Sequence, residues 1–496
     1  MIQFGIDTFT VEDIMTLVND RSNIHLSPSA ESQIQTSRKH IESILGKKKP
    51  TYGVNTGFGP LCDVRIPTAD INQLQENLLL SHAVGVGDHL STDLSRLMLL
   101  TKIHSLAKGY SGVRLELLER LIYFNNHDLI SAVPEQGSVG ASGDLAPLSH
   151  LFLPLIAHGH FLIDDEPIPA KEILDKHQLD VFQLQAKEGL ALINGTQFML
   201  AHAIVGLDRM AYLLDLADLA GAMSLEAFQG SASTFHPGVH ELRPYEGTKH
   251  VANRMRHYLH DSQNLKSHFE CDRVQDPYSI RCIPQVHGAS RNAYSHLKQL
   301  TEIELNAVTD NPIILNEEEA ISGGSFHGQP LAMALDYCSI AAAEMGNISD
   351  RRSYLLLEGK YGLPKLLTKE GGLNSGFMIP QYTTAALVSE NKSLCFPASA
   401  DSIPTSLGQE DHVSMGSISG RQFNQILGNL EKILAIELLY ATQGLDYRRP
   451  NTFSKTVERA HALIRTKVQP LGKDRLLKID IDEMITLVQN RSFEFE

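Results

Sequence analysis

Apolar residues recur at intervals of three and four positions through much of the second half of the chain. Between Gln197 and Leu225 this spacing places aliphatic side chains on one face of a helix. The same spacing predicts long helices over Ser290–Val308, Gly328–Leu357 and Val413–Leu445. The first of these three must end before Pro312, because proline cannot continue a helix and biases the preceding residue away from helical angles.

The helix predicted over Val413–Leu445 is apolar on nearly every side. Its apolar positions are Ile418, Phe423, Ile426, Leu427, Leu430, Ile433, Leu434 and Ile436. Because a helix of this kind must be buried on every side, we expect it in the middle of a bundle.

Patterns typical of strands are few and short, and glycine-rich stretches separate the helical segments. These stretches, which we interpret as ordered loops, are Tyr52–Pro60, Gly137–Gly143, Gly323–Gly328 and Gly371–Gly376. The sequence therefore predicts a mostly α-helical protein. We expect a smaller mixed N-terminal region over residues 1–195 and a long central helical bundle over residues 196–496.

Charge and composition exclude several classes of function. The 496 residues include 43 Lys and Arg against 58 Asp and Glu, a net charge of −15. This acidic balance argues against a nucleic-acid partner, which requires a basic surface. The most apolar window, Leu145–Leu162, contains two prolines and three histidines, so it predicts a buried segment and no membrane span. His158 and His160 lack a third ligand pattern, so we expect no metal site.

The cysteines and the N-terminus indicate a cytoplasmic protein. Five cysteines are widely spaced and form no C-x-x-C pair, which is typical of reduced thiols. The first ten residues lack the basic start of a signal peptide.

The stretch Gly137–Asp144, with the sequence GSVGASGD, carries the strongest chemical signal. Its glycine spacing differs from that of dinucleotide-binding and P-loop motifs, and Asp144 stands where a serine-nucleophile elbow needs glycine. The stretch can instead undergo a reaction of its own backbone. In a tight turn the Gly143 nitrogen can attack the Ala141 carbonyl, and loss of the Ser142 hydroxyl then leaves an exocyclic methylidene. A plain glycine-rich turn is the alternative.

The longer segment Gly137–His150, GSVGASGDLAPLSH, resembles the signature of the aromatic amino-acid ammonia-lyase family. Six further segments resemble motifs of that family in the family's order, namely Tyr52–Gly59, Gln75–Ala83, Leu192–Thr196, Val274–Cys282, Asn306–Pro312 and Gln409–Met415. The resemblance implies that Ala141, Ser142 and Gly143 form a 4-methylidene-imidazole-5-one cofactor autocatalytically. That group is an electrophile for the substrate amine, the inverse of a protein nucleophile.

The resemblance also implies roles for residues outside the tripeptide. Tyr52 is the candidate base, which needs a cationic setting because a tyrosine pKa is ordinarily about 10. Tyr278 joins it as a catalytic residue. Arg281 is the candidate clamp for the substrate carboxylate. The remaining substrate-binding candidates are His82, Asn194, Gln275, Phe326 and Glu410. Taken alone, each of these residues also has an ordinary packing, capping or surface explanation.

Within the family, the chain most resembles the histidine-specific branch. The motifs concerned are Ser81-His82, Gln275–Tyr278 and Gln409–His412. The resemblance implies elimination of ammonia from L-histidine to give trans-urocanate, the first step of histidine degradation, with His82 and Glu410 holding the imidazole. Ser325 and Leu407-Gly408 depart from the family pattern near the expected substrate pocket, which bears on substrate preference.

The resemblance further implies a homotetramer with active sites shared between chains. Three alternatives remain open from the sequence. A tyrosine or phenylalanine ammonia-lyase or aminomutase would use the same cofactor. A serine amidase or hydrolase would keep the Ser142 hydroxyl and need a lysine or histidine partner. A non-catalytic helical assembly protein would leave the glycine-rich loops unexplained.

Overall fold

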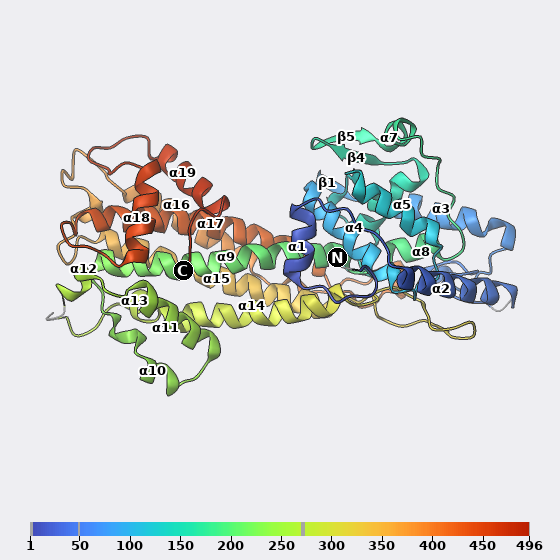
Figure 1. The fold of residues 1–496 in the computed structure, drawn as a ribbon, viewed down its shortest axis with the longest axis horizontal. Coiled ribbons are helices and arrows are strands. Elements are labelled where there is room, and N and C mark those ends of the chain that lie inside the picture. The colour runs from blue at the N-terminus through green and yellow to red at the C-terminus, as the bar shows by residue number, and fades with distance from the viewer. Residues whose placement is uncertain (1–2, 48–49, 269–272, 496) are drawn as a thin grey trace. The chain divides into compact units, whose positions relative to one another are not determined.

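The computed structural model describes residues 3–47, 50–268 and 273–495. It is mostly helical with few short strands, which confirms the predicted fold class (Figure 1). The chain forms two compact units that alternate along the sequence. Unit 1 comprises Met1–Asp208, Leu297–Asp336 and Pro397–Arg421, and unit 2 comprises Arg209–His296, Tyr337–Phe396 and Gln422–Glu496. The single boundary at residue 195 stays a prediction.

Unit 1 combines short helices with three small antiparallel sheets. Its helices are α1 (Val11–Asn19), α2 (Pro28–Gly46), α3 (Ile71–His82), α4 (Thr92–Ala107), α5 (Leu115–Asn126), α6 (Leu145–Phe152), α7 (Ala170–Lys176) and α8 (Glu188–Ile193). The sheets pair β1 (Val86–His89) with β3 (Pro134–Gln136), order β2 (Ile130–Ser131), β4 (His160–Ile163) and β5 (Glu166–Pro169) side by side, and pair β6 (Ile313–Ile314) with β7 (Ala320–Ile321).

Helix α4 forms the interior of unit 1. Every residue from Ser95 to Ala107 is buried, so this helix has no solvent-exposed face over that span. Helices α3, α6 and α8 pack against one another beside it. The approach of α3 to α8 is close, because a Cβ on Gly189 would lie 2.5 Å from the Gln75 carbonyl oxygen. The Gln75 side chain in turn accepts a hydrogen bond from the Leu190 amide at 3.3 Å.

The four long helices predicted from apolar periodicity are all present. They are α9 (Gln197–Phe228), α14 (Ile283–Leu305), α15 (Gln329–Leu357) and α17 (Gly416–Asp446). Helix α14 begins at Ile283, earlier than the predicted Ser290, because Pro284 is tolerated in a first helical turn. Among the described residues, no helix combines the length and apolar character needed to cross a membrane.

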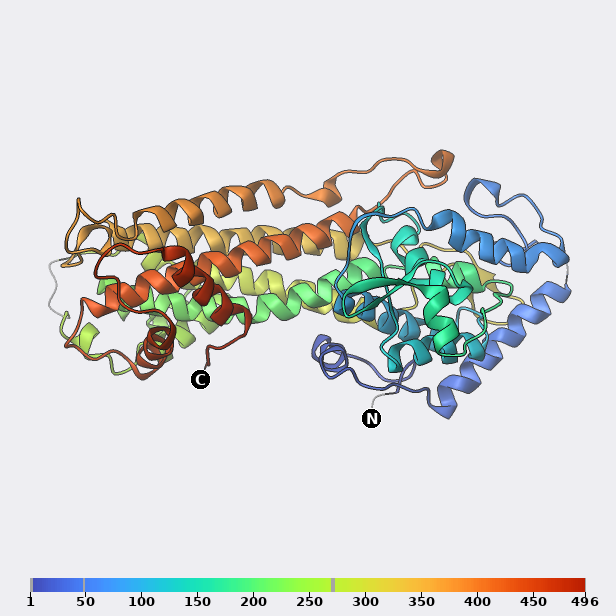
Figure 2. The same cartoon turned by 90° about the horizontal axis from the view of Figure 1, so that it is seen from above.

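Unit 2 is a helical bundle that contains parts of these four long helices. Its other helices are α10 (Pro237–Glu241), α11 (Glu246–Tyr258), α12 (Gln263–Lys266), α13 (Tyr278–Arg281), α16 (Met378–Leu394), α18 (Lys455–Lys467) and α19 (Leu477–Gln489). Within the unit, α15, α16 and α17 run alongside one another (Figure 2). Residues 433–445 of α17 are all buried, as predicted from its all-round apolar pattern.

A buried network of charges crosses the centre of this bundle. Arg352 on α15 donates to both carboxylate oxygens of Glu437 on α17, at 2.5 and 2.9 Å, and both side chains are fully buried. Ser224 on α9 donates to the same carboxylate at 2.7 Å. Nearby, burial of Asp218 would raise its pKa, but the hydrogen bond from His287 and the charges of neighbouring arginines lower that pKa to about 2.

We expect Arg352→Met to destabilise the protein by about 3–5 kcal/mol, because it leaves the Glu437 carboxylate buried without its cation. The midpoint of urea unfolding measures this loss. Lys478→Met is the matched control, since it removes an exposed i,i+4 partner of Asp482 and should cost about 0–1 kcal/mol. If the double variant Arg352→Met/Glu437→Leu is no more stable than Arg352→Met alone, the unpaired charge is not the cause.

Candidate active site

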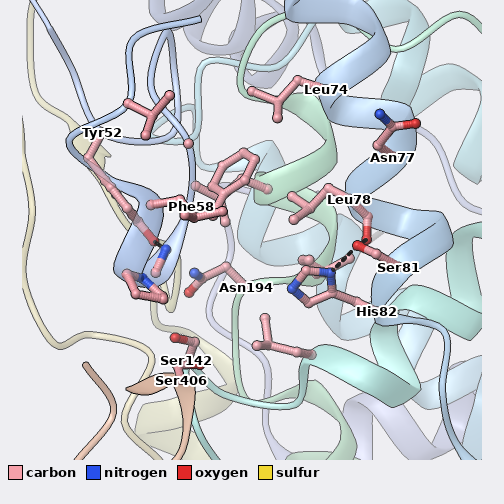
Figure 3. A pocket seen from close by; sticks show the side chains of 18 of the residues that line it. Tyr52, Phe58, Leu74, Asn77, Leu78, Ser81, His82, Ser142, Asn194 and Ser406 are labelled. Carbon is pink, nitrogen blue, oxygen red and sulfur yellow. Dashed lines mark hydrogen bonds between the residues drawn. The ribbon is translucent and has the colours of Figure 1, made fainter. Parts of the chain in front are cut away.

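Unit 1 contains a cavity of about 490 Å³ that gathers five of the predicted site residues. These residues are Tyr52, His82, Ser142, Asn194 and Glu410. Much of the remaining lining is apolar, and Phe58, Leu74 and Leu78 lie around the cavity with Tyr52 and His82 (Figure 3). The described lining residues include no lysine or arginine. The cavity therefore offers an apolar space with a few polar groups, which is typical of a small-molecule site.

The loop before α6 makes a tight turn at the predicted tripeptide. Ser142 has a φ of 50° and Gly143 a φ of 79°, so two successive residues adopt left-handed backbone angles. Such angles are costly for a serine and persist only where the surroundings enforce them. Ala141 is half-buried, and Gly143 is buried. The turn at the tripeptide is thus tight and strained.

A backbone pairing with Gly195 holds this turn in place. Gly143 and Gly195 form an isolated parallel bridge, in which the Gly195 amide donates to the Ser142 carbonyl oxygen at 3.4 Å. The Asp144 amide donates to the Gly195 carbonyl at 2.7 Å. A Cβ on Gly143 would lie 2.1 Å from the Gly195 carbonyl oxygen. Only glycine at position 143 therefore permits this approach.

The Asp144 side chain ties the turn to the first turn of α9. Its carboxylate accepts hydrogen bonds from the backbone amides of Phe198 and Met199, both at 3.1 Å, and from the Ser138 hydroxyl at 2.9 Å. Burial raises the pKa of Asp144 to about 7, although these three hydrogen bonds favour the carboxylate. The interaction places an acidic group at a helix N-terminus, where the helix dipole stabilises negative charge.

Glu410 lies directly against the turn. Its Oε1 accepts a hydrogen bond from the Ser142 hydroxyl at 2.7 Å, and its Oε2 accepts from Thr405 and Ser406 at 2.9 and 2.8 Å. The intervening turn is strained, with left-handed φ angles at Ser406, Leu407 and Gly408. Leu407 is 95% exposed and does not line the cavity. Leu407 and Gly408, which depart from the family pattern, therefore act on the site through the turn that carries Glu410.

His82 lies at the C-terminal end of α3 and faces the cavity (Figure 3). Its Nδ1 is 2.9 Å from the Ser81 hydroxyl. Burial lowers the pKa of His82, although the Leu78 carbonyl and the Glu410 charge act in the opposite direction. The imidazole is therefore biased towards its neutral form, which has one donor and one acceptor nitrogen.

Tyr52 and Asn194 complete the polar groups of the cavity. Burial raises the pKa of Tyr52, and the Glu410 charge raises it further, while a weak hydrogen bond from the Gly59 amide at 3.4 Å lowers it. The cationic setting expected for Tyr52 is thus not supplied by the described lining of this cavity. The buried Asn194 Oδ1 has no hydrogen-bond partner in the described chain, so it is available to a ligand.

Apart from Ala141 and Gly143 of the turn, four predicted site residues do not line this cavity. Phe326 belongs to unit 1 and is half-buried, but it does not line the space. Gln275, Tyr278 and Arg281 belong to unit 2, where Gln275 and Arg281 line a separate cavity of about 600 Å³. Tyr278 is 71% exposed, and the Arg281 guanidinium lies 4.5 Å from the centre of its ring.

Sequence reasoning missed several residues that shape the site. Asp144 adjoins the tripeptide, and Thr405 and Ser406 lie in the segment before Glu410, but side chains that only orient a loop carry no pattern of their own. Lys102 carried a signal, because a lysine within the apolar run of α4 is unusual for a buried helix. Among the described residues, no three His, Cys, Asp or Glu side chains form a group able to hold a metal ion.

Comparison with known proteins identifies the family. The model of the aromatic amino acid lyase family matches residues 9–466. The chain belongs to this family. A histidine ammonia-lyase of Stigmatella aurantiaca is 46% identical over 98% of this chain and 95% of its own length. The chain is thus a carbon–nitrogen lyase, and the resemblance inferred from seven motifs is confirmed.

Solved structures of lyase-family members share the fold. The crystal structure of histidine ammonia-lyase from Trypanosoma cruzi has a TM-score of 0.90 and 40% identity, covering 99% of this chain and 93% of that one. Tyrosine aminomutase from Streptomyces globisporus has a TM-score of 0.93 and 34% identity, covering 99% and 98%. The fold is therefore common to lyases and aminomutases, and it does not by itself determine the substrate.

Proposed function

We propose that this chain eliminates ammonia from L-histidine without oxidation, giving trans-urocanate in the first step of histidine degradation. One observation carries the proposal: the Ser142 turn shares a cavity with the Glu410 carboxylate and the His82 imidazole. The similarity to histidine ammonia-lyases over nearly the whole chain supports the same substrate. We also propose that the protein works in the cytoplasm.

The cofactor proposed here is 4-methylidene-imidazole-5-one, formed autocatalytically from Ala141, Ser142 and Gly143. The residues present fit it, since the turn at Ser142 is strained and the Gly143 nitrogen bears no side chain. When formed, this group supplies an electrophilic carbon that accepts the substrate amine. No metal or nucleotide is part of the proposal. Asn194, with its unpartnered Oδ1, would bind a substrate donor beside the turn.

Selection of the imidazole side chain is assigned to His82 and Glu410. An imidazole presents one donor and one acceptor, and a neutral histidine beside a carboxylate can satisfy both. The lowered pKa of His82 keeps it neutral near pH 7, and the fixed turn holds Glu410 in place. The apolar side chains around them, among them Leu74 and Leu78, offer a surface for the ring.

The base and the carboxylate clamp require charges that this cavity lacks. Tyr52, with its raised pKa, can act as a base near neutral pH only beside a cation. We therefore assign the clamp to Arg281, with Tyr278, Gln275 and Phe326 as further site residues, contributed by other chains of a homotetramer. Exposed apolar side chains on unit 2 support assembly, namely Tyr337, Ile340, Tyr354, Ile379 and Tyr382. Residues 433–445 of α17 are already buried within one chain, so they do not require assembly.

The alternative is a tyrosine or phenylalanine lyase or aminomutase with the same cofactor, which the similarity to tyrosine aminomutase favours. A carboxylate at position 410 suits an imidazole better than a phenyl ring, because a phenyl ring has no N–H or O–H to donate to it. A serine hydrolase is disfavoured, since the Ser142 hydroxyl donates to Glu410, while His82 bonds to Ser81.

The mass of the intact purified chain should be two waters below the mass of the sequence. Ring closure and loss of the Ser142 hydroxyl each remove one water. Ser142→Ala should abolish turnover and the ultraviolet absorption of the ring while the far-ultraviolet circular dichroism stays unchanged. An active enzyme of unmodified mass would overturn the cofactor assignment.

Glu410→Gln should lower kcat/KM for L-histidine by roughly tenfold to a hundredfold, because a hydrogen bond to a charged group is worth about 1.5–3 kcal/mol. The measurement follows formation of the conjugated acid from histidine, tyrosine and phenylalanine. Asp411→Asn is the matched control, because this neighbouring acid is exposed and does not line the cavity. Faster turnover of tyrosine than of histidine by the wild type would refute the substrate assignment and leave the chemistry intact.

Mixing two inactive variants, Tyr52→Phe and Arg281→Ala, after reversible dissociation should restore part of the activity. If sites are shared, some mixed sites receive both wild-type residues. Each variant dissociated and reassembled alone is the control. Light scattering that gives a monomer at working concentration, or no recovery despite mixing shown by mass spectrometry, would contradict shared sites.

A further inference from the structure

Lys102 lies behind the candidate active site and takes no direct part in the function proposed above. It belongs to α4, is only 1% exposed, and does not line the cavity. Its ammonium donates a hydrogen bond of 2.5 Å to the backbone carbonyl oxygen of Asn194. A buried lysine is costly unless its hydrogen bonds compensate, so its contact with this one carbonyl is informative.

That carbonyl belongs to the same peptide group as the amide that contacts the tripeptide. The Asn194 C=O accepts from Lys102, and the Gly195 N–H of this peptide donates to the Ser142 carbonyl oxygen at 3.4 Å. A single planar peptide therefore connects the buried ammonium to the Ser142 carbonyl. Hydrogen bonds in such a chain polarise one another, and a charged donor at one end strengthens the donor at the other.

The Ser142 carbonyl oxygen is the atom on which charge develops when the Ser142 side chain loses water. In that step the Cα–H and Cβ–Oγ bonds of Ser142 break, and the electron pair of the Cα–H bond forms the Cα=Cβ double bond. The proton and the hydroxide leave together as one water. While the Cα–H bond breaks, negative charge spreads onto the adjacent carbonyl oxygen, where a fixed N–H donor stabilises it.

We propose that Lys102 is a positioning residue for cofactor formation, which holds and polarises the Asn194–Gly195 peptide so that the Gly195 N–H stabilises charge on the Ser142 carbonyl. The inference rests on the proposed function, in that it presupposes dehydration of Ser142. It assigns the buried ammonium a role in making the electrophile, and none in binding the substrate.

Neighbouring charges leave the Lys102 ammonium available to donate to the Asn194 carbonyl. The nearby Lys187 ammonium is paired with Asp310 at 2.6 Å, and both side chains are buried. Burial lowers the pKa of Lys102 to about 7, Asp310 and Asp144 raise it, and Lys187 lowers it. Asp310 thus forms its ion pair with Lys187, and Lys102 donates instead to the Asn194 peptide.

The test compares full-length Lys102→Arg, Lys102→Gln and Lys102→Met with the wild type. The first keeps charge and donor, the second keeps a neutral donor, and the third keeps neither. Intact mass of the soluble, folded fraction during cell-free synthesis gives the rate at which each chain loses its waters. We expect this rate to fall in the order Arg, Gln, Met. The loss in Lys102→Met should be roughly tenfold to a hundredfold. Removal of a direct oxyanion donor costs more, about a hundredfold to a thousandfold, because Lys102 acts only through the intervening peptide.

The absorption of the matured loop provides a second readout. A hydrogen bond to a conjugated carbonyl oxygen lowers the energy of its main absorption, so we expect the band of Lys102→Met at shorter wavelength than that of the wild type. Arg352→Met is the control, because it removes a buried cation that bonds to Glu437 and not to the Asn194 peptide. It should lower stability and leave both the maturation rate and the band position unchanged.

Each outcome decides the proposal. Wild-type rate and band position in Lys102→Gln and Lys102→Met, or equal slowing in Arg352→Met, would overturn it. If Lys102→Met fails to fold, the comparison of Lys102→Arg with Lys102→Gln decides, and equal rates for the two would overturn the role of charge. A wild-type chain that retains both waters would instead refute the proposed function itself.

Discussion

The approach of two backbone segments at Gly143 and Gly195 is the constraint on which the rest of the site depends. The Gly195 carbonyl would clash with any side chain at position 143, so glycine is required there. The same pairing fixes Ser142 in a left-handed conformation and brings its hydroxyl against Glu410. Asp144 then anchors the segment to the start of α9 through two backbone amides. Strain in the turn is therefore balanced by hydrogen bonds on both of its sides.

A second constraint is electrostatic. Burial in the cavity removes water from Tyr52 and His82. It raises the pKa of Tyr52 and lowers the pKa of His82, so both side chains favour their neutral forms. The only charged side chain that lines the described part of this cavity is Glu410, which opposes ionisation of a tyrosine. Under the proposed function, one chain provides the tripeptide and the two groups assigned to the imidazole, and the positive charge for the substrate carboxylate is assigned to another chain. The absence of lysine and arginine from the described lining is the physical reason for proposing shared sites.

Much of this arrangement could be predicted from the sequence. The helical spacing in segments such as Gln197–Leu225 is a local property, so it predicts the long helices, with errors of up to seven residues at their ends. The interleaved units were not found, because α9 continues through the boundary at Asp208 with no change in its apolar pattern. Tyr52, His82 and Glu410 were placed in one site through motifs alone. The raised pKa of Tyr52 was not anticipated, since it depends on burial and on Glu410, a residue distant in sequence.

The segment that carries Glu410 is nearly self-contained. Thr405 and Ser406 bind its carboxylate, the Thr405 amide binds its carbonyl, and the left-handed turn between them closes the loop. Residues 405–410 therefore hold the Glu410 carboxylate through bonds within the segment and one bond from Ser142. Under the proposed function, a substitution in this segment would change a group presented to the substrate ring and leave the backbone pairing of Gly143 with Gly195 in place. Recognition of the ring and support of the turn are in this sense separable parts of one cavity.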